Sequence, residues 1–228
     1  MQTFRFPTRT AKSTRALALL ALGVTLGSAA QAGGGTLPPV RVTLNGTGCT
    51  PQIGPVLFGF RPDQAASREV QALFADDQAA RRAPPQSIDW TRVSREDAAR
   101  RAQTLGLLRA GRLSAGQDYL AAAFIFQHGD CPGHYRLANL LAEQAVRRGT
   151  GEARWIYAAT FDRWQRSLGR PQRYGTQYLN VGTGCNFKLE PYDPATTDEE
   201  RTRYDVPPLA EALRRADEIN AQCRAAQP

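Results

Sequence analysis

The chain has 228 residues, of which 29 are basic and 21 acidic, giving a formal net charge of +8 at neutral pH. Four basic residues and no acidic residue lie within the first 32 positions, so 25 basic residues face 21 acidic ones in the rest of the chain. This remaining excess of +4 is too small to argue for nucleic-acid binding. All basic residues except Lys12 and Lys188 are arginine, a bias typical of a GC-rich bacterial genome.

Residues 1–32 have the three-part pattern of a cleavable secretory signal peptide. A charged start precedes an apolar run from Ala16 to about Leu26, and the small-residue triplet Ala30-Gln31-Ala32 follows. The apolar run is about half of the roughly 20 residues needed to span a bilayer. We therefore predict cleavage before Gly33, export to the periplasm or beyond, and no transmembrane segment in the mature chain.

Four cysteines follow the predicted cleavage site, at Cys49, Cys131, Cys185 and Cys223. An even number of cysteines in an oxidising compartment predicts two disulfides. Their shortest separation is 38 residues, which matches no zinc site, so we expect no metal and no other cofactor. Of the three possible pairings we favour Cys131 with Cys185 and Cys49 with Cys223, because Cys131 and Cys185 flank the polar cluster described below.

The mature chain is expected to fold as a mainly α domain over residues 63–228, preceded by an extended N-terminal arm over residues 33–62. The arm is rich in glycine and proline and contains one short alternating strand around residues 40–44. A first helix is predicted over residues 63–82. A second helix is predicted from Ser94, acting as its cap, to near Gly111.

The next helix is expected to be the central one. Ser114 and Gln117 have capping-box spacing, and the residues that follow are apolar on every side, which predicts a helix buried all round. Helices are expected to follow over 130–149, with Asp130 as cap, over 152–168 and over 209–224. A β-hairpin is expected near 176–190 and a helical turn opening at Thr197. The predicted architecture is a compact bundle of antiparallel helix hairpins with one small β-hairpin.

Polar residues interrupt the apolar faces of two of these helices. Gln127 and His128 continue the stripe of Phe124, and Asp162 and Arg163 share a face with Trp155. An unpaired buried polar group costs about 1–3 kcal/mol, so these side chains need partners. The ends of these two helices can converge with the loop that follows the helix of Asp162 and Arg163. If they do, one polar site results, formed by Gln127, His128, Asp162, Arg163, Gln172, Tyr174 and Gln177.

Three interpretations of this cluster remain open. It can be a structural hydrogen-bond network in which His128 is neutral and partnered. It can be a ligand pocket in which Arg163 offers a planar fork to a carboxylate or phosphate, with Tyr174 and the glutamines orienting it. It can be a hydrolytic site with His128 as general base held by Asp162, although no nucleophile is evident.

The predicted function is binding or scaffolding in the bacterial envelope, with an envelope protein or a small anionic ligand as partner. The alternative is a periplasmic or secreted hydrolase that uses His128, Asp162 and Arg163. Nucleic acid is not expected as a partner.

Residues 115–220 also carry an ordered string of short motifs. They are Gln127-His128-Gly129, Asp162-Arg163, Pro171-Gln172-x-Tyr174-Gly175-Thr176-Gln177, Asp193-Pro194-x-Thr196-Thr197-Asp198 and Val206-Pro207-Pro208-Leu209. This string resembles an uncharacterised bacterial family, a domain of unknown function, and the resemblance implies no activity, ligand or catalytic residue. The paired helices are also weakly similar to Sel1 and tetratricopeptide solenoids, although no repeat of about 34 residues recurs.

Overall fold

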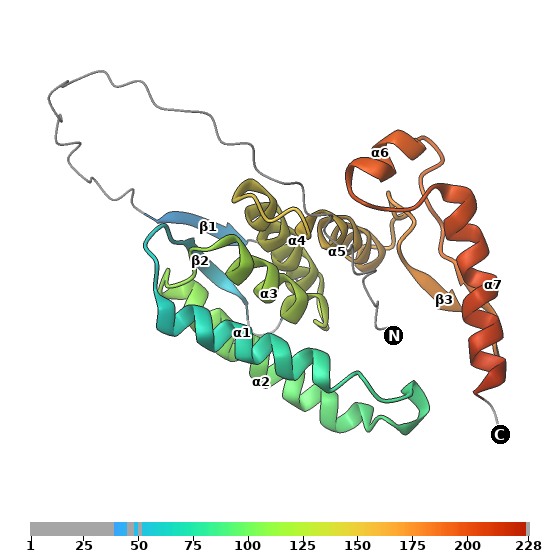
Figure 1. Ribbon diagram of the computed structural model, residues 1–228, viewed down its shortest axis with the longest axis horizontal. Helices are drawn as coiled ribbons and strands as arrows, with labels where there is room; N and C mark the ends of the chain where they lie inside the picture. The colour runs from blue at the N-terminus through green and yellow to red at the C-terminus, as the bar shows by residue number, and fades with distance from the viewer. Residues whose placement is uncertain (1–38, 45–47, 50–51, 227–228) are drawn as a thin grey trace, which may run out of the picture.

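The computed structural model describes residues 39–44, 48–49 and 52–226 (Figure 1). The predicted signal peptide and the predicted mature N-terminus at Gly33 lie outside these residues. Seven α-helices and two antiparallel two-stranded sheets make up the described part of the chain, which confirms the mainly α fold class with a small hairpin. In this part, no helix has both the length and the apolar character needed to span a membrane.

The N-terminal arm forms a β-hairpin and not a single strand. β1 (Val40–Leu44) pairs with β2 (Gly54–Phe58), and Thr43 stands opposite Pro55 in the register. The prediction missed β2 because Pro55 argues against a strand. In a two-stranded sheet each strand is an edge strand, where proline is tolerated because its missing N–H can face outwards. The side chain of Val56 is fully buried, so the hairpin closes one side of the helical core.

The first two helices, α1 (Gln64–Ala79) and α2 (Trp90–Arg109), form an antiparallel hairpin (Figure 1). Asp63 caps α1 and Asp89 caps α2, since each carboxylate accepts a hydrogen bond from the backbone N–H three residues further on. The predicted start of the second helix at Ser94 was therefore wrong. Aspartate caps as well as serine does, and the earlier start adds one more turn of backbone hydrogen bonds.

The central helix is α3 (Gly116–Gln127), and all its residues from Asp118 onward are buried. It contacts α1, α2, α4 and α5, which confirms the prediction of a helix surrounded on every side. Its start differs in detail from the predicted pairing of Ser114 with Gln117. The Asp118 carboxylate instead reaches back to the N–H groups of Ser114 and Ala115, at 3.4 and 3.1 Å.

Two further helices, α4 (Pro132–Arg147) and α5 (Ala153–Ser167), follow at the predicted positions. Cys131 precedes the first turn of α4 as its N-cap residue, so Asp130 does not cap this helix. The Asp130 carboxylate instead pairs with the Arg101 guanidinium of α2 at 2.9 Å. That pair fixes the short connection between α3 and α4, where the candidate site begins.

The C-terminal segment contains a second hairpin and two helices. β3 (Tyr178–Asn180) and β4 (Phe187–Leu189) pair as expected, followed by α6 (Asp198–Arg203) and α7 (Leu209–Ala225) (Figure 1). The amide side chain of Asn220 in α7 both accepts from and donates to the Phe187 backbone, at 2.6 and 2.9 Å. These bonds attach the hairpin to α7.

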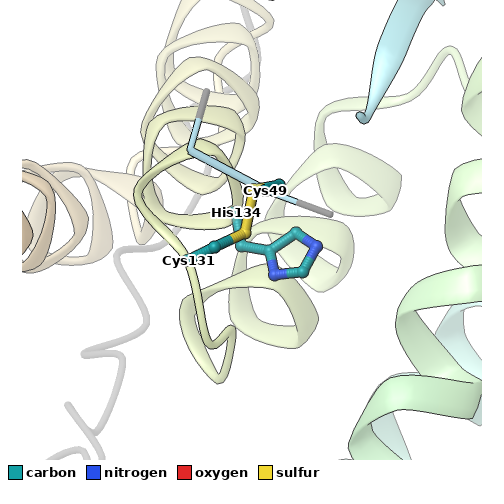
Figure 2. Close-up of side chains that lie close together, drawn as sticks. All are labelled: Cys49, Cys131 and His134. Atoms are coloured by element: carbon teal, nitrogen blue, oxygen red, sulfur yellow. A yellow bond between two sulfur atoms is a disulfide. The ribbon is translucent and has the colours of Figure 1, made fainter. Parts of the chain in front are cut away.

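Both predicted disulfides are present, but their pairing differs from the favoured one. Cys49 is bonded to Cys131, beside the ring of His134 (Figure 2), and Cys185 is bonded to Cys223. Cys185 lies in the turn of the β3–β4 hairpin, and that hairpin packs on the helix that carries Cys223. The favoured pairing was wrong because it assumed that the turn lies near the start of α4.

Candidate functional site

A cavity of about 330 Å³ lies where the helical bundle meets the β3–β4 hairpin and α7. Helices α1, α3 and α5 contribute to its wall along with these C-terminal elements. The lining residues are Gln78, Arg81, Phe124, Gln127, His128, Trp155, Arg163, Arg166, Thr176, Gln177, Tyr178, Phe187 and Ile219.

The predicted cluster divides into two groups in the structure. Four of its residues line the cavity, namely Gln127, His128, Arg163 and Gln177. The other three, Asp162, Gln172 and Tyr174, are buried behind the wall. The predicted convergence of the ends of α3 and α5 is therefore found, but only part of the expected set faces the cavity.

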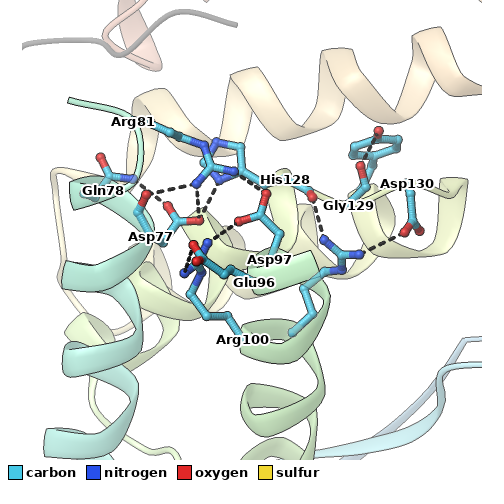
Figure 3. Close-up of polar contacts among 11 residues, drawn as sticks. Asp77, Gln78, Arg81, Glu96, Asp97, Arg100, His128, Gly129 and Asp130 are labelled. Carbon is cyan, nitrogen blue, oxygen red and sulfur yellow. Dashed lines mark hydrogen bonds and ion pairs between the residues drawn. The ribbon is translucent and has the colours of Figure 1, made fainter. Parts of the chain in front are cut away.

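His128 is held from both its side chain and its backbone (Figure 3). Its Nδ1 lies 2.9 Å from the Asp77 carboxylate of α1, and Arg101 donates to its carbonyl oxygen at 2.6 Å. Burial lowers the pKa of His128, and although the bond to Asp77 opposes this, the pKa stays below its ordinary value, so the ring is neutral at neutral pH. Because a carboxylate only accepts, Nδ1 carries the proton. Nε2 has no hydrogen-bond partner among the described residues.

The charge of Arg81 is compensated at the edge of the cavity (Figure 3). Its guanidinium donates to the Asp77 carboxylate at 3.0 Å and forms a short ion pair with Asp97, which also pairs with Arg100 at 2.6 Å. Burial would raise the pKa of Asp77, but its hydrogen bond with His128 and the positive charge of Arg81 outweigh this effect, so the pKa lies below its ordinary value. Asp77 is therefore ionised at neutral pH.

Arg163 differs from the other two arginines of the wall. Arg81 has its two carboxylates, and Arg166 forms an ion pair with Glu190. The Arg163 guanidinium makes no hydrogen bond or ion pair within the described ranges, and its Nε is buried without a partner. Burial lowers the pKa of Arg163 to about 10, so it stays protonated at neutral pH. Among the described residues of the wall, Arg163 is thus the one arginine without a direct carboxylate partner, although the charge of the Glu190 carboxylate also acts on it.

Asp162 holds the loop that follows α5 and does not hold His128. Its buried carboxylate accepts from the N–H groups of Arg173, Tyr174 and Thr176 at 2.7, 2.9 and 3.0 Å, and from the Thr176 hydroxyl at 2.7 Å. Burial raises the pKa of Asp162, although these four hydrogen bonds oppose the rise. The expectation that Asp162 orients His128 was wrong, and Asp77 takes that position.

The glutamines and the tyrosine of the same loop complete this structural network. Gln172 donates through its amide to the carbonyl oxygens of Gln177 and Glu190 at 3.0 and 2.9 Å, and accepts from the Gln177 N–H at 2.9 Å. The ring of Tyr174 lies 5.0 Å from that of Tyr204. Gln172 and Tyr174 therefore serve the fold, and neither is available to orient a ligand.

The sequence interpretation missed Asp77 and Arg81, although a signal for them existed. On α1 the apolar positions Val70 and Phe74 are continued at helical spacing by Asp77 and then Arg81. This is the same pattern, a polar group on an apolar stripe, that identified His128 on α3.

Cys49, Cys131 and His134 form the one group of potential metal ligands in the described part of the chain. Their ligand atoms lie within 4.8 Å of one another (Figure 2). The two sulfur atoms are joined in a disulfide, so neither offers the thiolate that binds metals. The His134 imidazole pairs instead with the Asp130 carboxylate at 3.0 Å. In the oxidised protein this group supports the α3–α4 connection.

Comparisons of the chain with protein-family models, with curated proteins and with solved structures find no match. The resemblance of residues 115–220 to a bacterial family therefore stays a prediction.

Proposed function

We propose that this chain is an exported protein that binds a small anionic ligand in the cavity, with Arg163 as the main ligand-binding residue. The observation that carries the proposal is the guanidinium of Arg163, which lines the cavity without a partner among the described residues. Arg163 is only partly buried as a residue, but a charge that is partly removed from water and makes no direct ion pair still carries a desolvation cost. An oxyanion bound through two parallel N–H···O bonds would compensate that charge.

Two neutral groups that line the same cavity as Arg163 support the same proposal. Neither the side-chain amide of Gln127 nor Nε2 of His128 has a hydrogen-bond partner in the described part of the chain, and both residues line the cavity. The amide can donate or accept, and Nε2 can accept from a ligand hydroxyl. Gln177 also lines the cavity, but its side-chain amide already donates to the Thr176 hydroxyl at 2.8 Å.

The size of the cavity favours a small molecule over a protein segment. Its volume of about 330 Å³ is near the lower end of the roughly 300–1,000 Å³ found for ligand pockets. Its several walls come from segments distant in sequence, so the pocket exists only in the folded chain.

Binding is tested by replacing Arg163 with methionine, which keeps an unbranched apolar stem to about the position of Nε and removes the charged guanidinium. The probes are acetate, phosphate, phenylacetate and phenyl phosphate at constant ionic strength. We expect at least one probe to raise the Tm of the wild type but not that of Arg163→Met. A probe at one hundred times its Kd stabilises by about 2.7 kcal/mol.

Arg170→Met is the matched control, because Arg170 is exposed on the loop after α5. This variant should respond to the probes as the wild type does. Without a probe, Arg163→Met should be at least as stable as the wild type, since it removes a partly buried charge that has no ion-pair partner among the described residues. A fall in Tm without a probe, no response of the wild type to any probe, or an equal response of Arg163→Met would contradict the proposal.

Export is the second part of the proposal. The leader pattern of residues 1–32 and the two disulfides support it, because disulfides persist in oxidising compartments. N-terminal sequencing of the secreted product should begin at Gly33. A product that retains Met1 would overturn this part.

The second candidate function is hydrolysis, and the pairing of His128 with Asp77 favours it. A neutral imidazole oriented by a carboxylate at Nδ1 is the arrangement of a general base. The hydroxyl of Thr176 lies in the wall but donates to Asp162, so a water molecule would be the nucleophile. If the site is hydrolytic, Asp77→Asn should abolish the turnover of ester substrates while the binding of the anionic product persists.

A further inference from the structure

The cavity wall has an apolar part beside its polar group. Phe124 of α3 and Trp155 of α5 contribute to it from the bundle, and Phe187 of β4 and Ile219 of α7 contribute from the C-terminal segment. A bare inorganic anion would leave the parts of these side chains that line the cavity facing water. A ligand that removed their surface from water would gain binding free energy in proportion to the apolar area that it buries.

The charged side chains around the cavity can compensate one negative charge on a ligand but not two. Arg81 already faces the carboxylates of Asp77 and Asp97, and Arg166 is paired with Glu190. Arg163 is the one arginine of the described wall that has no carboxylate partner. His128, whose ring is neutral at neutral pH, adds no positive charge. A second negative charge on a ligand would enter the cavity without a counterion.

The hydrogen-bonding groups of the wall also suit a carboxylate. The two oxygens of a carboxylate can accept from both arms of the Arg163 fork. The amide of Gln127 also lines the cavity and offers a further donor. Gln177 is less available, because its amide donates to the Thr176 hydroxyl at 2.8 Å.

From these observations we infer that the ligand is an organic monocarboxylate with an apolar, preferably aromatic, body. Its carboxylate binds Arg163, and its body packs against Phe124, Trp155 and Phe187. This inference rests on the proposed function and adds the class of ligand. It separates the cavity from sites for inorganic anions and for phosphate monoesters.

Isothermal titration calorimetry at pH 8 and constant ionic strength tests the inference with acetate, phenylacetate and phenyl phosphate, using competition for weak probes. Phenylacetate should bind at least tenfold more tightly than acetate, because only phenylacetate covers the apolar wall. It should also bind more tightly than phenyl phosphate, which is a dianion at this pH. Arg163→Met should lose phenylacetate binding, while Arg170→Met should keep it.

A second variant tests the apolar body separately. Phe187 is only partly buried, and its bonds to Asn220 run through its backbone, so Phe187→Ala should fold. This variant should weaken phenylacetate binding at least fivefold and leave acetate binding unchanged. An equal loss for both probes would contradict the assignment of Phe187 to the body of the ligand.

The outcomes distinguish a wrong ligand class from a wrong proposed function. If acetate binds as tightly as phenylacetate, or if phenyl phosphate binds most tightly, the ligand class is wrong while anion binding at Arg163 survives. If no probe binds the wild type, or if Arg163→Met binds as the wild type does, both the ligand class and the proposed function fail.

Discussion

Replacing Asp162 with asparagine tests the network that fastens the loop after α5 to the bundle. The carboxylate is fully buried and accepts four hydrogen bonds, three of them from backbone N–H groups of residues 173, 174 and 176. Asparagine has nearly the same shape but only one accepting oxygen. Its NH₂ group must therefore face donors that the carboxylate satisfies.

The expected cost follows from these bonds. The asparagine oxygen can retain two of the four, and the hydroxyl of Thr176 can turn to accept from the new NH₂ group. The Thr176 N–H is then left facing another donor, and an unsatisfied buried group of this kind lowers the free energy of unfolding by about 1–3 kcal/mol. The loss of the charge-assisted bonds lowers it further. Since burial raises the pKa of Asp162, a neutral side chain recovers part of the desolvation cost. We expect a net loss of about 3 kcal/mol.

Thermal unfolding followed by circular dichroism measures this loss. For a chain of this size, 3 kcal/mol lowers Tm by roughly 6–12 °C. Asp193→Asn is the matched control, because Asp193 is exposed and its carboxylate accepts one local hydrogen bond, from the Ala195 N–H at 2.9 Å. Its cost should be under about 1 kcal/mol. Equal shifts in Tm for the two variants would refute the reasoning.

Lowering the pH through about 6.5 should destabilise the fold. The pKa of His128 is held below its ordinary value in the folded chain, so its imidazole takes up a proton in the unfolded chain first, which favours unfolding. Melting curves of His128→Gln should vary less with pH between 7 and 5, and an unchanged slope would contradict this. Changing both Cys185 and Cys223 to serine opens the 38-residue loop that their disulfide closes and should lower the free energy of unfolding by about 4 kcal/mol. The double variant should also bind phenylacetate more weakly, because the β3–β4 hairpin forms part of the cavity wall. Unchanged affinity in calorimetry would argue against this role of the hairpin. Gly59→Ala should lower the free energy of unfolding, measured with denaturant, by about 1–3 kcal/mol, because the new Cβ would overlap a backbone carbonyl oxygen of the α2–α3 connection. Gly106→Ala should cause no such loss, because there is open space around its new methyl group. Equal effects of the two substitutions would count against this packing.

Part of the candidate site was predictable from the sequence, because the relevant signals are local. Gln127 and His128 continue the apolar stripe of α3, and Arg163 shares a face with Trp155 on α5, so all three were expected to point inwards. The same pattern on α1 marks Asp77. The partner of His128 was not predictable in this way, since Asp77 and His128 are 51 residues apart and meet only through the packing of α1 on α3.

The sequence by itself determined the number and order of the main helices, the burial of the central helix and the presence of two disulfides. These features depend on periodicity, on caps within a few residues and on composition, which are properties of short segments. Only the tertiary structure decided that Cys49 pairs with Cys131, that Asp77 and not Asp162 holds His128, and that Arg163 forms no ion pair among the described residues. The reason is that each of these facts is a relation between surfaces of different elements, and such relations are set by how the whole core packs.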